Sequence, residues 1–92
     1  LRSRSALHLG SVPLWLESQR TNATVWIDPQ GQISSPYQKI HLFDVDVPGA
    51  PPVRESEQFG AGSRPATLEF RGWKLGLTIC YDIRFAELYV HY

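Results

Sequence analysis

The stretch from residue 73 to residue 92 constrains the fold most, because its hydrophobic period changes in the middle and the only cysteine lies at the change. A short buried strand is predicted for its first part, which carries Leu75, Leu77, Thr78 and Ile79. A helix is predicted for its second part by the spacing of Phe85, Leu88, Tyr89 and Tyr92. Cys80 is therefore expected at a strand-to-helix junction, where unpaired backbone N–H groups favour thiolate over thiol. A nucleophile would be well placed there, although a lone cysteine is more often a small buried hydrophobe.

The composition restricts the kinds of partner. The chain has 92 residues, and nine Lys and Arg balance nine Asp and Glu, so the net charge indicates no broad basic surface for nucleic acid or an anionic membrane. One cysteine cannot form an internal disulfide, and no apolar run approaches membrane-spanning length. We therefore expect a cytoplasmic protein that binds neither nucleic acid nor membrane and recognises its ligand locally.

Strands and a tight turn are predicted in the first half of the chain. Residues 6–14 favour an edge or bulged strand, because Gly10 and Pro13 interrupt their alternation. Residues 17–22 are polar and are expected to form a connection, and the β-branched and aromatic residues 23–27 a strand. The Asp-Pro-Gln-Gly sequence at residues 28–31 then predicts a hairpin turn.

The returning strand is expected from residue 32, with irregular pairing at Pro36, so that Lys39 lies just beyond a strand. Residues 44–65 are rich in proline and glycine and predict a long loop, which we interpret as functional. Residues 67–70, the turn Arg71-Gly72 and residues 73–79 predict a second hairpin that leads to Cys80.

Three sequence blocks together carry a family resemblance. They are Tyr-Gln-Lys-Ile-His-Leu-Phe-Asp-Val-Asp-Val-Pro-Gly at residues 37–49, Arg-Glu-Ser at 54–56 and Gly-Leu-Thr-Ile-Cys-Tyr-Asp-Ile-Arg-Phe at 76–85. In order and spacing they resemble the lysine and cysteine motifs of the nitrilase (carbon–nitrogen hydrolase) superfamily, and most of all its Nit-type amidase branch. The resemblance implies an α/β fold, a four-layer αββα sandwich. Residues 1–92 would form an internal part of one such domain, mostly strands with the start of a C-terminal helix.

The resemblance also implies a chemistry: hydrolysis of a small carboxylate-bearing amide by a Glu-Lys-Cys triad through a thioester, with release of ammonia and no metal or cofactor. Cys80 would be the nucleophile and Lys39 the triad lysine, while Glu55 matches a further family glutamate that supports the site. The residue types suit this reaction, because a cation beside Cys80 lowers the pKa of the thiol and holds the oxyanion. The backbone N–H of Tyr81 would be a second oxyanion donor.

The chain departs from the family pattern in two ways. The family's catalytic glutamate belongs to a motif ahead of Leu1, so residues 1–92 alone are expected to be inactive. Where the family usually has Arg-Phe-Pro-Glu-Leu, this chain has alanine at position 86, which fits a first helical turn without strain. Family members are commonly homo-oligomers, and we expect the same here.

Other interpretations of the sequence remain open. The chain could be a non-catalytic module of the same fold, a pseudoenzyme or a fused domain that binds a ligand or a partner. Lys39 and Glu55 would, without the motif, be solvated surface charges. His41 could indicate a Cys-His hydrolase, and with Asp44, Asp46 and His91 a metal site, but the spacing matches no ligand pattern. The remaining aromatic residues of interest are predicted to be core: Trp26, Trp73 and Tyr89.

Overall fold

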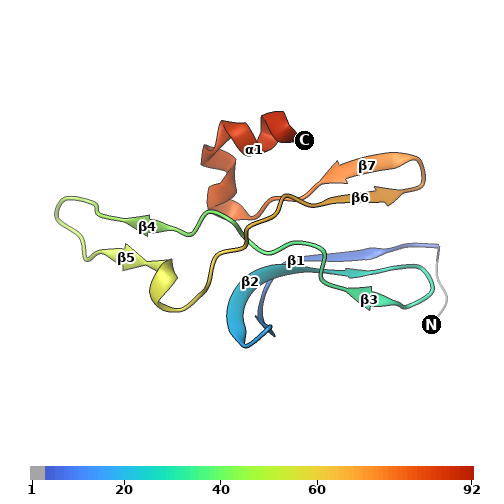
Figure 1. The fold of residues 1–92 in the computed structure, drawn as a ribbon, viewed down its shortest axis with the longest axis horizontal. Helices are drawn as coiled ribbons and strands as arrows, with labels where there is room; N and C mark the ends of the chain where they lie inside the picture. Colours follow the sequence, from blue (N-terminus) through green and yellow to red (C-terminus); the bar gives the residue numbers. More distant parts are fainter. Residues whose placement is uncertain (1–3) are drawn as a thin grey trace.

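The computed structural model describes residues 4–92, which form mostly strands with one short α-helix at the C-terminal end (Figure 1). The strands are β1 (Leu7–Leu16), β2 (Gln19–Ile27), β3 (Ile33–Ser34), β4 (Asp44–Val45), β5 (Val53–Arg54), β6 (Thr67–Phe70) and β7 (Trp73–Gly76). The helical segments are the 3-10 helices η1 (Glu55–Glu57) and η2 (Cys80–Arg84) and the α-helix α1 (Ala86–His91). The predicted proportion of strand and helix is thus confirmed. Among residues 4–92, no helix has the length and apolar character needed to cross a bilayer.

The first three strands form one antiparallel sheet in the order β1-β2-β3. β1 is an edge strand, and its register with β2 shifts between Leu9 and Val12, which confirms the predicted edge position and bulge. The predicted connection over residues 17–22 is wrong beyond Ser18, because β2 already begins at Gln19 and pairs with Leu16. These polar residues are strand because pairing with β1 and a bridge from Thr21 to Gly60 hold their backbone, whatever their side chains.

The turn after β2 forms as its sequence predicts. Asp28 Oδ1 accepts the N–H groups of Gln30 and Gln32, each at 2.9 Å, and the Gly31 N–H donates to the Asp28 carbonyl at 2.9 Å. Gly31 has φ 84°, a left-handed conformation that glycine adopts without strain. The pairing beyond Pro36 is irregular, as predicted, and shrinks to a single bridge between Ala23 and Gln38.

The predicted loop of residues 44–65 is more ordered than expected. β4 and β5 pair as a small antiparallel hairpin that projects from one end of the molecule, and η1 follows directly (Figure 1). The chain then returns along the first sheet, where the Gly60 N–H donates to the Arg20 carbonyl and the Gly62 N–H to the Lys39 carbonyl, each at 2.8 Å. The segment therefore connects the two ends of the fold.

The last hairpin pairs β6 with β7 through a two-residue turn. Arg71 and Gly72 have φ 50° and 82°, the pair of left-handed conformations typical of a type I′ turn, so this prediction is confirmed. The predicted strand does not continue to Ile79: β7 ends at Gly76, and only the Leu77 N–H, donating to the Ala66 carbonyl at 3.0 Å, extends the pairing. β6 begins at Thr67 and offers the residues after Gly76 no further partner strand.

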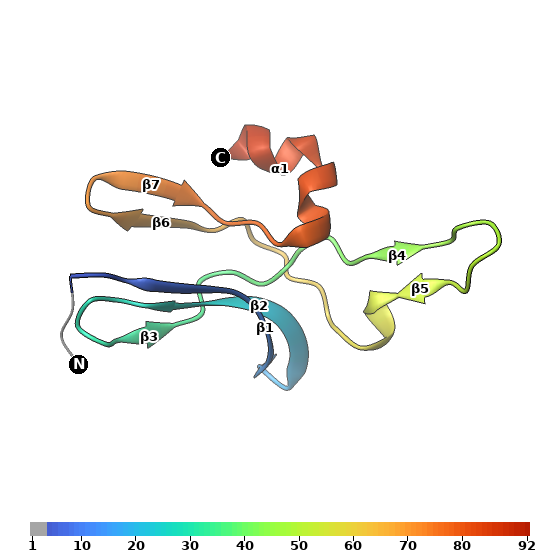
Figure 2. The same ribbon diagram turned by 180° about the vertical axis from the view of Figure 1, so that it is seen from behind.

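The core is small and lies where the hairpins meet, near the centre of the molecule (Figure 2). It consists of the buried residues Tyr37, Leu77 and Ile79, with Ile40, Ala66 and Leu68 packed against them. The Cα radius of gyration is 15.0 Å, whereas a compact chain of this length has about 12 Å, so the hairpins extend away from the core.

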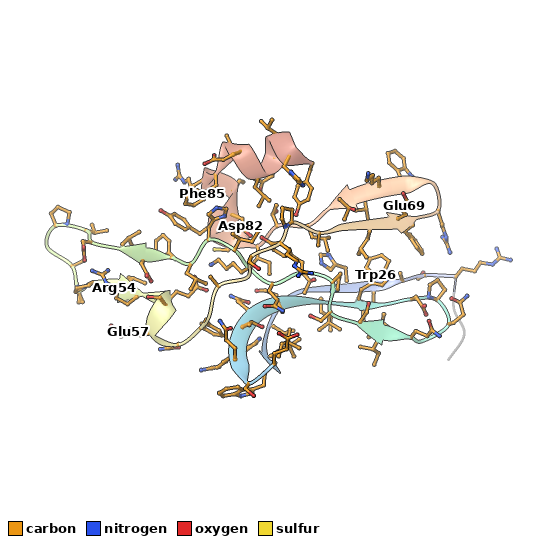
Figure 3. The ribbon with its side chains drawn as sticks, in the orientation of Figure 1. Trp26, Arg54, Glu57, Glu69, Asp82 and Phe85 are labelled. Carbon is orange, nitrogen blue, oxygen red and sulfur yellow. The ribbon has the colours of Figure 1, made fainter. Side chains whose placement is uncertain are left out.

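The core prediction for the aromatic residues is largely wrong. Trp73 is 73% exposed and Tyr89 is 42% exposed, because the buried cluster around Leu77 and Ile79 does not extend to them. Trp26, which is labelled in Figure 3, is half-buried. Its ring and that of Phe70 are in an edge-on contact with a centroid distance of 5.4 Å.

Candidate active site

Cys80 is an exposed residue at a strained turn. It follows the extended residue Ile79, begins η2 and has φ 48°, a conformation that few non-glycine residues adopt. The interpretation as a buried hydrophobe is therefore wrong. The predicted junction is present, but the helical segment that begins at Cys80 is a five-residue 3-10 helix, and α1 begins only at Ala86.

Lys39 and Glu55 form a buried ion pair, so neither is the solvated surface charge that its residue type suggests. Lys39 Nζ lies 2.6 Å from Glu55 Oε1, and the two side chains are 3% and 12% exposed. The Lys39 backbone is held on both sides, since its N–H donates to the Asn22 carbonyl and its carbonyl accepts from the Gly62 N–H, each at 2.8 Å. A Cβ at Gly62 would lie 2.3 Å from the Gln38 carbonyl oxygen, so this close approach requires glycine.

The groups around Glu55 favour the ionised form of its carboxyl group. Its Oε1 also accepts the Phe43 N–H at 2.6 Å, and its Oε2 accepts Nδ2 of Asn22 at 3.3 Å. Burial alone would raise the pKa of Glu55, but the bonds from Lys39, Phe43 and Asn22 outweigh it and hold the pKa below its usual value. Both carboxylate oxygens are thus engaged in holding Lys39 and its surroundings.

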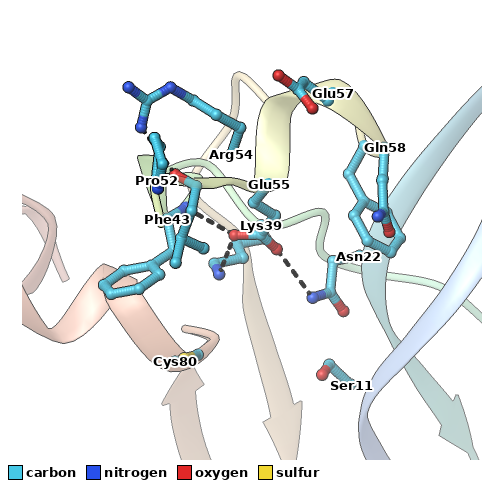
Figure 4. Close-up of a pocket in the computed structure, with 12 residues that line it drawn as sticks. Ser11, Asn22, Lys39, Phe43, Pro52, Arg54, Glu55, Glu57, Gln58 and Cys80 are labelled. Atoms are coloured by element: carbon cyan, nitrogen blue, oxygen red, sulfur yellow. Dashed lines mark hydrogen bonds and ion pairs between the residues drawn. The ribbon is translucent and has the colours of Figure 1, made fainter. Parts of the chain in front are cut away.

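One pocket of about 810 Å³ brings the predicted side chains together. Cys80, Lys39 and Glu55 all line it, and Figure 4 shows the Lys39–Glu55 pair above Cys80. Arg54 also lines the pocket, on the opposite side from Cys80. The Tyr81 N–H precedes the first hydrogen bond of η2, from Asp82 N–H to the Ile79 carbonyl at 3.0 Å, and so has no acceptor within the helix.

Asp82 is a buried residue at the site that the sequence analysis missed. Its carboxylate accepts the Tyr37 hydroxyl at 2.5 Å, the Ile79 N–H at 2.9 Å and the His41 N–H at 3.0 Å, and it pairs with His41 Nδ1 at 2.7 Å. Burial alone would raise the pKa of Asp82, but these hydrogen bonds hold it below the usual range. A carboxylate in the first turn after a strand-to-helix junction often caps the helix. The position of Asp82, two residues after Cys80, was therefore the sequence signal for this role.

The other histidine and aspartate residues do not gather into a ligand set. The His41 ring contacts Asp82 and stacks on Phe85 with centroids 3.7 Å apart. Asp44 accepts the Ser56 N–H at 3.0 Å, and Asp46 pairs with Arg54 at 2.7 Å. In the part of the chain that the structure describes, no cluster of three or more His, Cys, Asp or Glu residues could hold a metal ion.

The fold and the pocket define a strand-rich α/β protein in which a cysteine, a lysine and a carboxylate share one site. A family model for carbon-nitrogen hydrolases matches residues 2–92, and the chain therefore belongs to the carbon-nitrogen hydrolase family. It is 40% identical over 79 residues to the omega-amidase NIT2 of Homo sapiens, covering 86% of this chain and 29% of the relative. It is 38% identical over 86 residues to hydrolase C26A3.11 of Schizosaccharomyces pombe, covering 94% of this chain and 27% of the relative.

A solved structure gives the same result. The chain is similar to XC1258 of Xanthomonas campestris, a CN-hydrolase superfamily protein with an arsenic adduct in its active site, at a TM-score of 0.64 and 32% identity. The match covers 82% of this chain and 25% of that protein. These relatives confirm the nitrilase-superfamily resemblance and its Nit-type branch. The chain spans less than a third of the length of the relatives it matches.

Proposed function

We propose that the protein hydrolyses the carbon–nitrogen bond of a small amide through a thioester on Cys80 and releases ammonia. The observation that carries the proposal is the shared pocket of an exposed Cys80 and a buried, ion-paired Lys39. Similarity to omega-amidases over most of the chain supports the reaction class.

The proposed reaction has two halves. The Cys80 thiolate attacks the amide carbonyl carbon, and the carbon–nitrogen bond of the tetrahedral intermediate breaks as the nitrogen leaves with a proton as ammonia. Water then attacks the thioester carbonyl, the carbon–sulfur bond breaks, and the carboxylic acid and the thiol are restored. The Lys39 ammonium and the Tyr81 N–H would stabilise the negative oxygen in both halves.

In this proposal Glu55 holds Lys39 rather than moving protons. Its two oxygens already accept three donors, and its pKa is lowered, so it is a weak base. The carboxylate that takes the thiol proton and later activates water is then a different one. On the family resemblance, it is a glutamate ahead of Leu1.

The proposed substrate is a small amide that carries a carboxylate at its far end. Several relatives are named omega-amidases, which supports an amide at the end of the molecule. Arg54 lines the pocket on the side opposite Cys80 and is paired with Asp46, whose side chain is 72% exposed. An exposed ion pair contributes only about 0–1 kcal/mol, so a substrate carboxylate could replace Asp46 at little cost. Glu57 also lines the pocket near Arg54, so this part of the pocket carries a negative charge as well as a positive one.

We further propose a cytoplasmic location, which the single cysteine favours, and a homo-oligomer, which the family resemblance favours. The alternative function is a non-catalytic module in which the same pocket binds a ligand without turnover. The two differ in one step, the formation of a covalent acyl group on Cys80.

An acyl-trapping experiment tests the proposal. The full-length protein is mixed with a small carboxylate-bearing amide, ammonia is measured, and the acid-quenched protein is weighed by mass spectrometry. We expect ammonia release and an acyl adduct that maps to Cys80, and we expect Cys80→Ser to abolish the thioester. Ser34→Ala in β3, outside the pocket, is the matched control. Turnover that survives in Cys80→Ser contradicts the proposal, and binding without ammonia or adduct indicates the module.

A further inference from the structure

The Asp82 carboxylate connects the two chain segments that carry the proposed nucleophile and its lysine. Tyr37 and His41, two residues before and after Lys39, donate to it from one segment. The N–H that directly precedes Cys80 donates to it from the other segment, at 2.9 Å. Asp82 is completely buried, so these bonds do not compete with water.

No backbone ladder fixes the two segments relative to each other. Among residues 4–92, no backbone–backbone hydrogen bond joins residues 37–43 to residues 77–85. Ring contacts do join them, His41 on Phe85 at 3.7 Å and Phe43 on Tyr81 at 4.9 Å, but apolar and ring packing is less directional than a hydrogen bond. Asp82 is therefore the directional link.

Asp82 also closes the strained turn at Cys80. The Ile79 N–H donates to Asp82 Oδ2 at 2.9 Å, and the Asp82 N–H donates back to the Ile79 carbonyl at 3.0 Å. This reciprocal pair spans Cys80, whose φ of 48° persists only where its surroundings fix it. Figure 3 shows Asp82 near the centre of the molecule, where the hairpins meet.

We propose that Asp82 is a positioning residue, which sets the Cys80 sulfur relative to Lys39 through its bonds to Tyr37, His41 and the Ile79 N–H. The role deepens the proposed amidase function and rests on it. Burial and the Asp82 carboxylate raise the pKa of Tyr37, which therefore stays a proton donor to the ionised Asp82.

Asp82→Asn is the primary test, because asparagine keeps the shape of the side chain but replaces one of its two acceptor oxygens by an NH₂ group. Both oxygens of Asp82 accept hydrogen bonds, so in either orientation of the amide the NH₂ group would face a donor. We expect kcat per folded molecule to fall about 100-fold with KM nearly unchanged, as for a small misplacement of a reacting group. The rate at which iodoacetamide alkylates Cys80 is expected to fall in parallel.

Tyr37→Phe is the second variant, since it removes one donor and keeps the ring in the core. It is expected to lower kcat and the alkylation rate in the same direction as Asp82→Asn, and to add little in the double variant, because both changes break one network. Asp28→Asn is the matched control: that carboxylate also accepts two backbone N–H groups, but at the β2–β3 turn, away from the pocket.

The outcomes separate positioning from general stability. A positioning role predicts lower kcat and slower alkylation in protein that is fully folded by circular dichroism, with Asp28→Asn unaffected. Unchanged kcat and alkylation in folded Asp82→Asn and Tyr37→Phe overturn it. If Asp82→Asn does not fold, Tyr37→Phe decides alone. If the wild type releases no ammonia from any amide, the proposed function fails, and the alkylation rates alone decide on positioning.

Discussion

The buried Lys39–Glu55 pair makes a quantitative prediction about Glu55→Gln. Glutamine keeps the size of the side chain and one acceptor oxygen, so the bonds from Lys39 and the Phe43 N–H can persist. The charge is lost, however, and the new NH₂ group faces the amide donor of Asn22. Because the Lys39 side chain is only 3% exposed, water cannot replace the missing charge. We expect unfolding free energy to fall by about 2–3 kcal/mol at neutral pH.

The effect of this substitution depends on pH in a defined direction. The pKa of Glu55 is lower in the folded protein than its ordinary value of 4.5, so the folded state binds its proton more weakly than the unfolded state does. The resulting stability is fully present above the unfolded pKa and is lost as the pH falls through the folded pKa. The difference between wild type and Glu55→Gln is therefore expected to be largest at neutral pH and to shrink below about 4.5.

Urea unfolding of the full-length protein at a series of pH values measures this difference. Glu57→Gln is the matched control, because it removes a carboxylate from the same 3-10 helix at an exposed position. We expect it to change the unfolding free energy by less than about 0.5 kcal/mol. Equal effects of the two substitutions, or a Glu55→Gln effect that stays constant from neutral to acid pH, would refute the reasoning.

Three further predictions concern the site and the fold. Lys39→Ala is expected to lower kcat by about 100- to 1,000-fold in steady-state ammonia assays, as for loss of an oxyanion donor. It is also expected to lower the urea midpoint of unfolding, because Glu55 loses its buried partner. Full activity of the variant would exclude Lys39 from the chemistry. Cys80 in the full-length protein is expected to react with iodoacetamide faster than glutathione at neutral pH, and equal rates would count against the nucleophile assignment. Residues 1–92 expressed alone are expected to associate on size-exclusion chromatography and to release no ammonia, because Trp15, Ile83 and Val90 are 70–85% exposed; a monomer with cooperative unfolding would contradict this.

The local elements could be predicted where one signal dominates. The turn at Asp28 and the turn at Gly72 follow from residues that suit only a few backbone conformations, and the structure has both. The end of β7 could not be predicted, because Leu77 and Ile79 read as strand residues in any context, and only the position of β6 decides that their pairing stops. Strand ends depend on the partner strand, which local sequence does not describe.

The exposure of single residues was harder to predict than their presence at the site. Lys39 and Trp73 both contradict the ordinary preference of their residue types, the lysine being buried and the tryptophan exposed. Lys39 is buried because Glu55, from a segment 16 residues further along the chain, supplies the opposite charge. Trp73 is exposed because it pairs with Phe70 at the turn end of the β6–β7 hairpin, away from the buried cluster.

The network around Asp82 illustrates why a motif identifies a site more readily than it explains one. A sequence motif marks Lys39 and Cys80 but contains no information about how two segments 41 residues apart are held together. The structure supplies a short buried carboxylate that accepts from both segments. Its donors are a tyrosine and a histidine close to the lysine, and the backbone N–H of Ile79 next to the cysteine. Each of these residues has an ordinary interpretation on its own, as a core aromatic, a surface imidazole or a helix cap. Their common partner gives them one physical role, and only the folded arrangement brings them to it.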